Sequence, residues 1–148
     1  MADSTSTLSD SARSTSTLEN RVPLALLFLR LSIFLVLFMW VLDKFIKPDH
    51  AAQVFQFFYG VGGLGAVPVY LFGLVQLLII LAFVVGFQKK FTYAVVFAMH
   101  AASTLVSYKQ YLDPFTSPNL LFFAAFPMLA GCFALYHLRD LDTRWTIK

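Results

Sequence analysis

Four long apolar stretches, separated by short polar segments, dominate the chain after its first 21 residues. The first covers residues 23–42, and a helix of that length reaches about 30 Å, which is the thickness of the hydrocarbon layer of a bilayer. Further stretches of spanning length cover residues 67–87, 91–108 and 120–138. The pattern predicts an all-α fold in which four transmembrane helices form a polytopic membrane bundle.

The segment between the first two stretches, residues 44–65, is too mixed in composition to cross a membrane. A Pro-Asp pair at residues 48–49 is a typical helix-start signal, and polar residues then recur on one helical face. A cluster of glycines from Gly60 onward ends this pattern. We therefore expect a short amphipathic helix at the outer membrane interface, directly after the first span.

The chain divides into three parts by composition. Half of the first 20 residues are Ser or Thr, so residues 1–21 have little to bury and are predicted to be a disordered cytoplasmic tail. Residues 22–139 hold the four spans, and residues 140–148 are a charged cytoplasmic C-terminal tail. The short turn at residues 88–90 requires the second and third spans to be antiparallel neighbours.

The distribution of basic residues predicts the orientation of the spans, because Lys and Arg favour the cytoplasmic side of a membrane. One side of the predicted bundle carries seven of them, namely Arg13, Arg21, Lys89, Lys90, Arg139, Arg144 and Lys148. The other side carries three, namely Lys44, Lys47 and Lys109. We therefore predict a multi-pass protein of the inner cell membrane with both termini in the cytoplasm.

Composition supports a membrane protein and excludes several other classes. Hydrophobic residues make up 59% of the 148 residues and charged residues 13%, about half of the roughly 25% that is usual in a soluble domain. The net charge of +3 is spread over helix ends without a basic run, so no nucleic-acid binding is predicted. The single cysteine, Cys132, excludes dithiol chemistry within the chain and is expected to fill a helix contact. The histidines lie at different predicted depths, so no metal site is predicted.

Arg30 is the most informative single residue, because it lies about seven residues inside the first span. An arginine in hydrocarbon costs about 2.5–3.5 kcal/mol, so it is expected to face the bundle and to have a partner. Leu37 and Val41 lie between Arg30 and Lys44 on one helical face, which could form an inner seam that is basic at both ends. We expect Arg30 to point between helices, toward Gln76 or His100, and to anchor an anionic or carbonyl-bearing ligand or another subunit. The alternative is that its long side chain reaches the cytoplasmic headgroups.

Polar residues in the other spans complete a candidate ligand-binding set of Arg30, Lys44, Gln76, His100 and Ser103. His100 lies in the middle of the third span, with Ser103 on the same helical face, and a histidine there can relay protons or bind a quinone oxygen. Gln76, midway along the second span, is a candidate partner for His100 or Arg30. The alternative is that these residues only bridge helices and that Lys44 only marks the membrane exit. No catalytic residue is assigned.

The stretch LRLSIFLVLFMWVLDKFIKPDHAAQVFQFFYG, residues 29–60, resembles the opening of the DoxX-like membrane proteins, a family that includes the DoxD and MauE types. An Arg early in the first helix, a Lys at its outer end and a Pro-containing turn are typical of that family. Arg30, Lys44 and Pro48 occupy those places. Many relatives have a Gly before the Lys, in a G-x-x-K pattern, whereas this chain has Val41-Leu42-Asp43, and Asp43 could pair with Lys44.

The resemblance implies a four-helix bundle linked to membrane redox chemistry, such as thiosulfate:quinone oxidoreduction in DoxD-like members or maturation of a periplasmic dehydrogenase in MauE-like ones. We therefore expect an accessory or quinone-facing subunit of a membrane redox system, without catalytic activity of its own. No cofactor is required by the residues, and a quinone is the one that this role would involve. The expected partners are the lipid bilayer and a redox protein, and a homo-oligomer is compatible with the sequence. The alternative is a non-enzymatic scaffold, assembly factor or small-molecule carrier.

Overall fold

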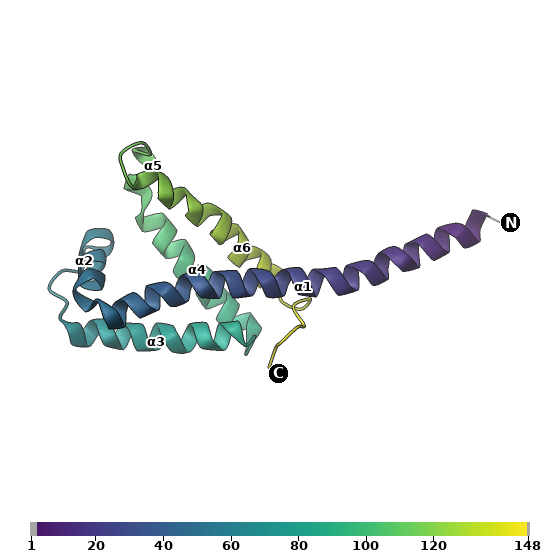
Figure 1. The fold of residues 1–148 in the computed structure, drawn as a ribbon, viewed down its shortest axis with the longest axis horizontal. Helices are drawn as coiled ribbons and strands as arrows, with labels where there is room; N and C mark the ends of the chain where they lie inside the picture. The colour runs from purple at the N-terminus through teal and green to yellow at the C-terminus, as the bar shows by residue number, and fades with distance from the viewer. Residues whose placement is uncertain (1–2, 148) are drawn as a thin grey trace.

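The computed structural model describes the backbone of residues 3–147 and the side chains of residues 18–147, and these residues form helices and no β-strand (Figure 1). The all-α class predicted from the sequence is confirmed. In chain order the elements are α1 (Asp3–Ile46), α2 (Pro48–Tyr59), α3 (Ala66–Val84), α4 (Lys89–Val106), α5 (Tyr108–Leu112), the 3-10 helix η1 (Asn119–Ala124) and α6 (Ala125–His137).

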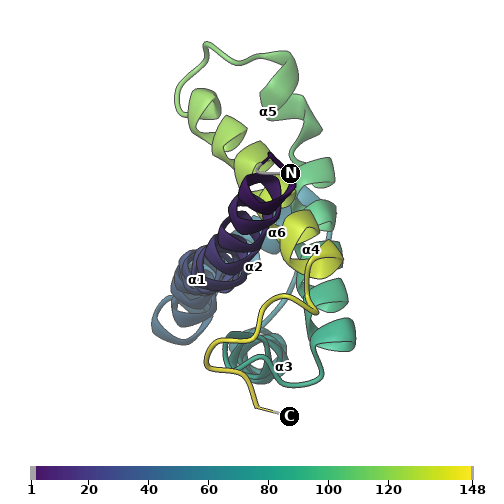
Figure 2. The ribbon, with the colours of Figure 1, turned by 90° about the vertical axis from the view of Figure 1, so that its right-hand side faces the viewer.

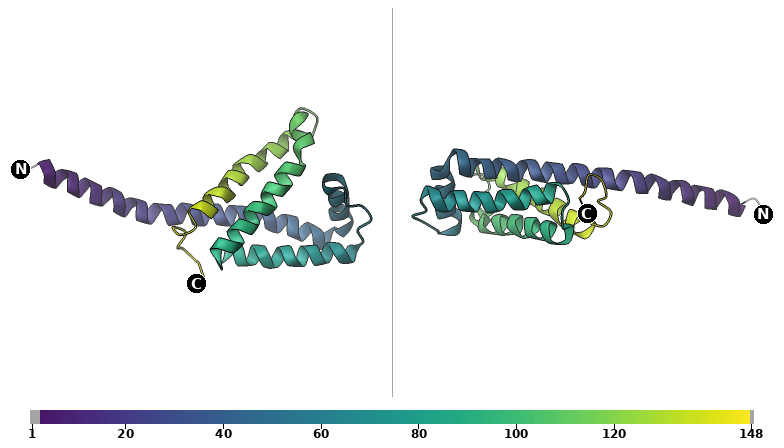
Figure 3. Two further views of the ribbon diagram at one scale, coloured as in Figure 1. Left: turned by 180° about the vertical axis from the view of Figure 1, so that it is seen from behind. Right: turned by 90° about the horizontal axis from the view of Figure 1, so that it is seen from below.

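The long helices form two antiparallel pairs, α1 with α3 and α4 with α6 (Figures 1 and 2). Contacts between α3 and α4 and between α1 and α6 join the two pairs. The pairs meet near the C-terminus and spread apart toward α2 and α5 (Figures 1 and 3). We call the end where the pairs meet the strap end, after the C-terminal segment that folds back there. We call the opposite end the wide end.

Three helices of the described chain are long and apolar enough to cross a membrane: Leu18–Ile46, Ala66–Val84 and Asn119–His137. The fourth predicted span, residues 91–108, is helical as α4 but is not among them. Two lysines at its start and several hydroxyl-bearing residues along its length reduce its hydropathy. The structure therefore supports membrane insertion through three helices, and the fourth crossing remains a prediction.

The N-terminal segment differs from the sequence prediction. Helix α1 begins at Asp3, so the described part of residues 1–21 continues the first span as a helix that projects beyond the other elements (Figure 3). Extending an existing helix adds one hydrogen bond per residue without a new nucleation step, which explains why a polar segment can follow a long apolar helix. Because the helix begins at Asp3, Pro23 lies inside α1 and not in its first turn. Residues 1 and 2 lie outside the described part.

The predicted short helix after the first span is confirmed as α2. It begins at Pro48 and ends where Gly60 adopts a left-handed conformation with φ 69°, which a residue with a side chain rarely adopts. Two ring pairs hold α2 in place, and both join it to other elements: Phe55 to Phe72 of α3 at 5.5 Å, and Phe58 to Phe122 of η1 at 5.8 Å between centroids. Helix α2 therefore lies across the wide end of the molecule.

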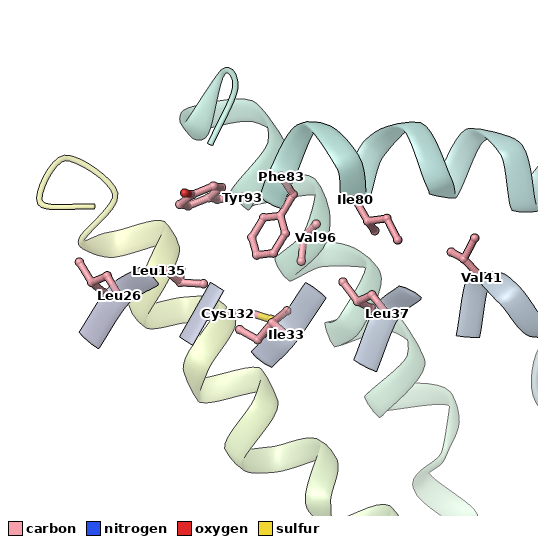
Figure 4. Close-up of a cluster of buried hydrophobic side chains, with 10 residues drawn as sticks. All are labelled: Leu26, Ile33, Leu37, Val41, Ile80, Phe83, Tyr93, Val96, Cys132 and Leu135. Atoms are coloured by element: carbon pink, nitrogen blue, oxygen red, sulfur yellow. The ribbon is translucent and has the colours of Figure 1, made fainter. Parts of the chain in front are cut away.

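The core contains side chains from all four long helices and lies between them (Figure 4). Helix α1 contributes Leu26, Ile33, Leu37 and Val41, which recur at helical spacing. The other helices contribute Ile80, Phe83, Tyr93, Val96, Cys132 and Leu135. Leu37 and Val41 of the possible α1 seam therefore lie in the core, whereas Lys44 does not, and Cys132 fills a helix contact as expected.

The segment after α6 folds back onto the bundle, whereas the sequence predicted a separate charged tail at residues 140–148. We call residues 140–147 the strap. The backbone N–H of Ile147 donates to the carbonyl oxygen of Val85 at 2.9 Å, and Lys89 Nζ donates to the carbonyl oxygen of Asp142 at 2.9 Å. Gly86 has φ 66°, and a Cβ added there would lie 2.6 Å from Thr146 Cγ2, so the strap fits only against a glycine. Lys148 lies outside the described part.

Replacing a core leucine tests this packing. Leu135 is fully buried, so Leu135→Ala should leave a cavity, cost about 2 kcal/mol or more, and lower the thermal unfolding midpoint in detergent. The matched control is Leu78→Ala, because the Leu78 side chain is 60% exposed on α3. Equal midpoints for the two variants would contradict the position of the core.

Candidate functional site

Arg30 lies in a buried polar cluster at the strap end. Its Nη1 lies 2.9 Å from Asp142 Oδ2 and donates to Tyr93 Oη at 3.0 Å, while the Tyr93 hydroxyl donates to the same carboxylate oxygen at 2.6 Å. Arg30 and Asp142 both have no exposed surface. We call these three residues the Arg30 node. It joins the first helix to α4 and to the strap.

The strap also receives the second arm of the guanidinium. Arg30 Nη2 donates to the carbonyl oxygens of Arg144 at 2.6 Å and Trp145 at 3.2 Å. Two buried atoms of the node, Arg30 Nε and Asp142 Oδ1, have no hydrogen-bond partner among the described residues. The ion pair is therefore buried and charge-balanced, but it is not fully hydrogen-bonded.

The prediction that Arg30 points between helices is correct, but the predicted partners are wrong. Arg30 contacts Asp142 and Tyr93, not Gln76 or His100. Side chains on a helix lean toward its N-terminus, so the guanidinium lies nearer the strap end than its Cα position suggests. Asp142 was missed because it follows the last predicted span and was assigned to a solvated tail. The useful signal was the need of an intramembrane arginine for an acidic partner.

A cavity of about 930 Å³ lies between the two helix pairs toward the wide end. Its walls come from all six α-helices and η1, and most of the lining side chains are aliphatic or aromatic. Four of the five candidate ligand-binding residues line it: Lys44, Gln76, His100 and Ser103. The structure therefore brings these four together from three helices, and it does not include Arg30 among them.

The polar groups of the cavity differ in what they can still bind. His100 Nε2 lies 3.0 Å from the carbonyl oxygen of Ala125, which can only accept, so this nitrogen carries the proton and Nδ1 of a neutral ring remains an acceptor. Ser103 Oγ donates to the carbonyl oxygen of His100 at 3.0 Å. The side chain of Gln76 forms no hydrogen bond with a described residue. Among these residues, Gln76 therefore does not make the predicted contact with His100 or Arg30. Its amide can both donate to and accept from a ligand.

Further polar groups lie near the wide end of the cavity. Lys44 Nζ donates to the carbonyl oxygen of Trp40 at 3.0 Å, which leaves two of its protons for other acceptors. The hydroxyl of Tyr111 is buried and has no partner among the described residues, and burial raises its pKa, so it remains a donor at neutral pH. The sequence suggested that Asp43 could pair with Lys44. In the structure Asp43 pairs instead with His50 Nδ1 of α2 at 2.8 Å. This pair holds α2 against the end of α1.

No match is found when the chain is compared with models of protein families, with curated proteins and with solved structures. The functional interpretation therefore depends on the geometry of the cavity and of the Arg30 node. The resemblance of residues 29–60 to the DoxX-like opening remains a prediction.

A double-mutant cycle tests the buried ion pair. Arg30→Met and Asp142→Leu should each leave one unpaired buried charge and cost about 3–5 kcal/mol, whereas the double variant should recover most of that loss. Thermal midpoints of the four proteins in one detergent measure the coupling. Additive losses in the double variant would contradict a direct pair.

Proposed function

We propose that this protein holds a quinone-type ligand in the cavity and acts as an accessory, quinone-facing subunit of a membrane redox system. The observation that carries this proposal is an apolar cavity of about 930 Å³ lined by Gln76 and His100. Ligand sites typically combine a volume of roughly 300–1,000 Å³ with apolar walls and a few convergent polar groups.

The polar groups suit both redox forms of such a ligand. The Gln76 amide can donate to a quinone carbonyl, while His100 Nδ1 can accept from the hydroxyl of the reduced form. The apolar walls would accept an aromatic ring and the start of a hydrocarbon tail. A ligand of this class would also supply partners for the half-buried Gln76 amide.

Electrons would have to come from another protein. Cys132 is the only cysteine of the sequence and is buried, so the chain has no thiol pair to oxidise. We therefore propose a redox partner protein beside the cavity, and no independent catalytic activity. The resemblance to DoxX-like proteins supports the same assignment.

The proposed topology has four crossings in the inner membrane, with both termini in the cytoplasm. Helix α4 would be the fourth span, because its polar residues Thr92, His100 and Thr104 face the protein interior and not lipid. Helix α4 begins at the strap end with Lys89 and Lys90, which supports a cytoplasmic position for that end.

The alternative is a non-enzymatic scaffold, assembly factor or small-molecule carrier. One observation favours a scaffold: Arg30, the most unusual residue of the first span, ties the strap to the bundle and does not line the cavity. In that case the cavity would hold bulk lipid without selectivity.

Extraction of bound lipids separates the two functions. Protein purified in mild detergent should carry quinone, and Gln76→Leu should lower the amount several-fold because the donor to the carbonyl is lost, as measured by chromatography and mass spectrometry of the extract. The control is Gln53→Leu, an equivalent change at an exposed position of α2 that does not line the cavity. Equal quinone in both variants, or phospholipid alone in the wild type, would favour the scaffold.

Reporter fusions test the topology. Fusions after Lys90 and after Ile147 should report the cytoplasm, and a fusion at Asp113, in the loop between α5 and η1, should report the opposite side. A cytoplasmic signal at Asp113 would exclude a fourth crossing by α4.

A further inference from the structure

Helices α4 and α6 both run from the strap end through buried apolar side chains to the cavity. On α4, Tyr93 belongs to the Arg30 node, Val96 to the core, and His100 to the cavity, over about 10 Å of helix. On α6 the order is Leu135, Cys132 and then Met128, which lines the cavity. An apolar layer therefore separates the node from the cavity.

We call this layer the plug and define it as Phe83, Val96, Cys132 and Leu135 (Figure 4). Each of these side chains is at most 2% exposed, and none lines the cavity. The plug therefore closes the cavity toward the strap end.

Tyr93 links the plug to the strap. Its ring packs edge-on against Phe83 with 5.1 Å between centroids, and its hydroxyl donates to Asp142 of the strap at 2.6 Å. Whatever holds Asp142 in place thus also holds the Tyr93 ring against the plug. Loss of the strap would leave both Tyr93 and Arg30 without their carboxylate.

The strap is attached mainly through polar contacts. Its carboxylate is Asp142, its carbonyl groups accept from Arg30 and Lys89, and its last described residue bonds to Val85. The side chains of Arg144, Trp145 and Ile147 are exposed and contribute little to this attachment. Because Arg30 Nε and Asp142 Oδ1 also lack partners, the strap is held less firmly than a fully bonded node would hold it.

We infer that the strap is a gate: residues 140–147 lock Tyr93 onto the plug and so seal the ligand cavity from the strap end. The identity of the ligand in this inference rests on the proposed function. The gate itself rests on the geometry alone. With the strap in place, a ligand enters and leaves only through the wide end or from the surrounding lipid. Release of the strap opens a path between the cavity and the strap end.

Cys132 allows a direct test, because it is the only thiol of the sequence and belongs to the plug. The full chain is reconstituted in sealed vesicles of known orientation, and a sulfonated maleimide that cannot cross lipid is added to one side at a time. Intact-mass spectrometry then follows the rate of labelling. A buried thiol reacts only when the structure around it opens, so this rate reports opening of the plug.

Asp142→Asn should increase the rate of labelling from the strap side about tenfold or more, since a charge-assisted hydrogen bond in the node is weakened. The matched control is Asp140→Asn, which removes the same charge from an exposed strap position and should label as slowly as the wild type. Tyr93→Phe keeps the Arg30–Asp142 pair but loses the link to the strap, and should give an intermediate rate.

Equal rates for Asp142→Asn, Asp140→Asn and the wild type would overturn the gate, as would labelling of Asp142→Asn from the wide end. Rapid labelling of the wild type would show that the plug is not sealed. If Asp142→Asn does not elute as a folded protein, Tyr93→Phe decides the question alone. None of these results depends on a bound quinone, so the gate and the proposed function can fail separately.

Discussion

The buried ion pair between Arg30 and Asp142 is the constraint on which the arrangement of this molecule depends. The two residues are 112 positions apart in the sequence, and neither has any contact with solvent. Removing either charge from water is costly, and the cost is offset only if the other is in place. The pair, with Tyr93 of α4 bonded to both of its members, therefore fixes the first helix, the start of α4 and the strap at one end, where the long helices meet.

Joining the helices at one end has a consequence at the other. The α1–α3 and α4–α6 pairs spread apart, and α2 lies across the gap with its Asp43–His50 pair and its two ring contacts. The space that remains is the cavity, whose polar groups are only partly bonded by the protein itself. The polar groups that hold the protein together and those that can still bind a ligand thus lie in different parts of the molecule. The first form the Arg30 node at the strap end, and the second, such as Gln76, line the cavity.

Features that depend on local sequence could be predicted, and features that depend on distant partners could not. The apolar stretches predicted the long helices, and the Pro-Asp start and Gly60 predicted both ends of α2. Gln76 and His100 were identified because a polar residue in an apolar helix is conspicuous, and both line the cavity. Asp142 was not identified, because its pairing with Arg30 arises only when the chain folds back on itself, and no local pattern encodes that.

The order of the node along the chain also has a consequence for biosynthesis. Arg30 belongs to the first helix, but its carboxylate partner follows the last one, so every helix must be synthesised before the pair can form. During that interval the guanidinium lacks its counter-charge, and insertion of the first helix depends on its long apolar flanks. A chain that ends before Asp142 would keep an arginine without this carboxylate partner.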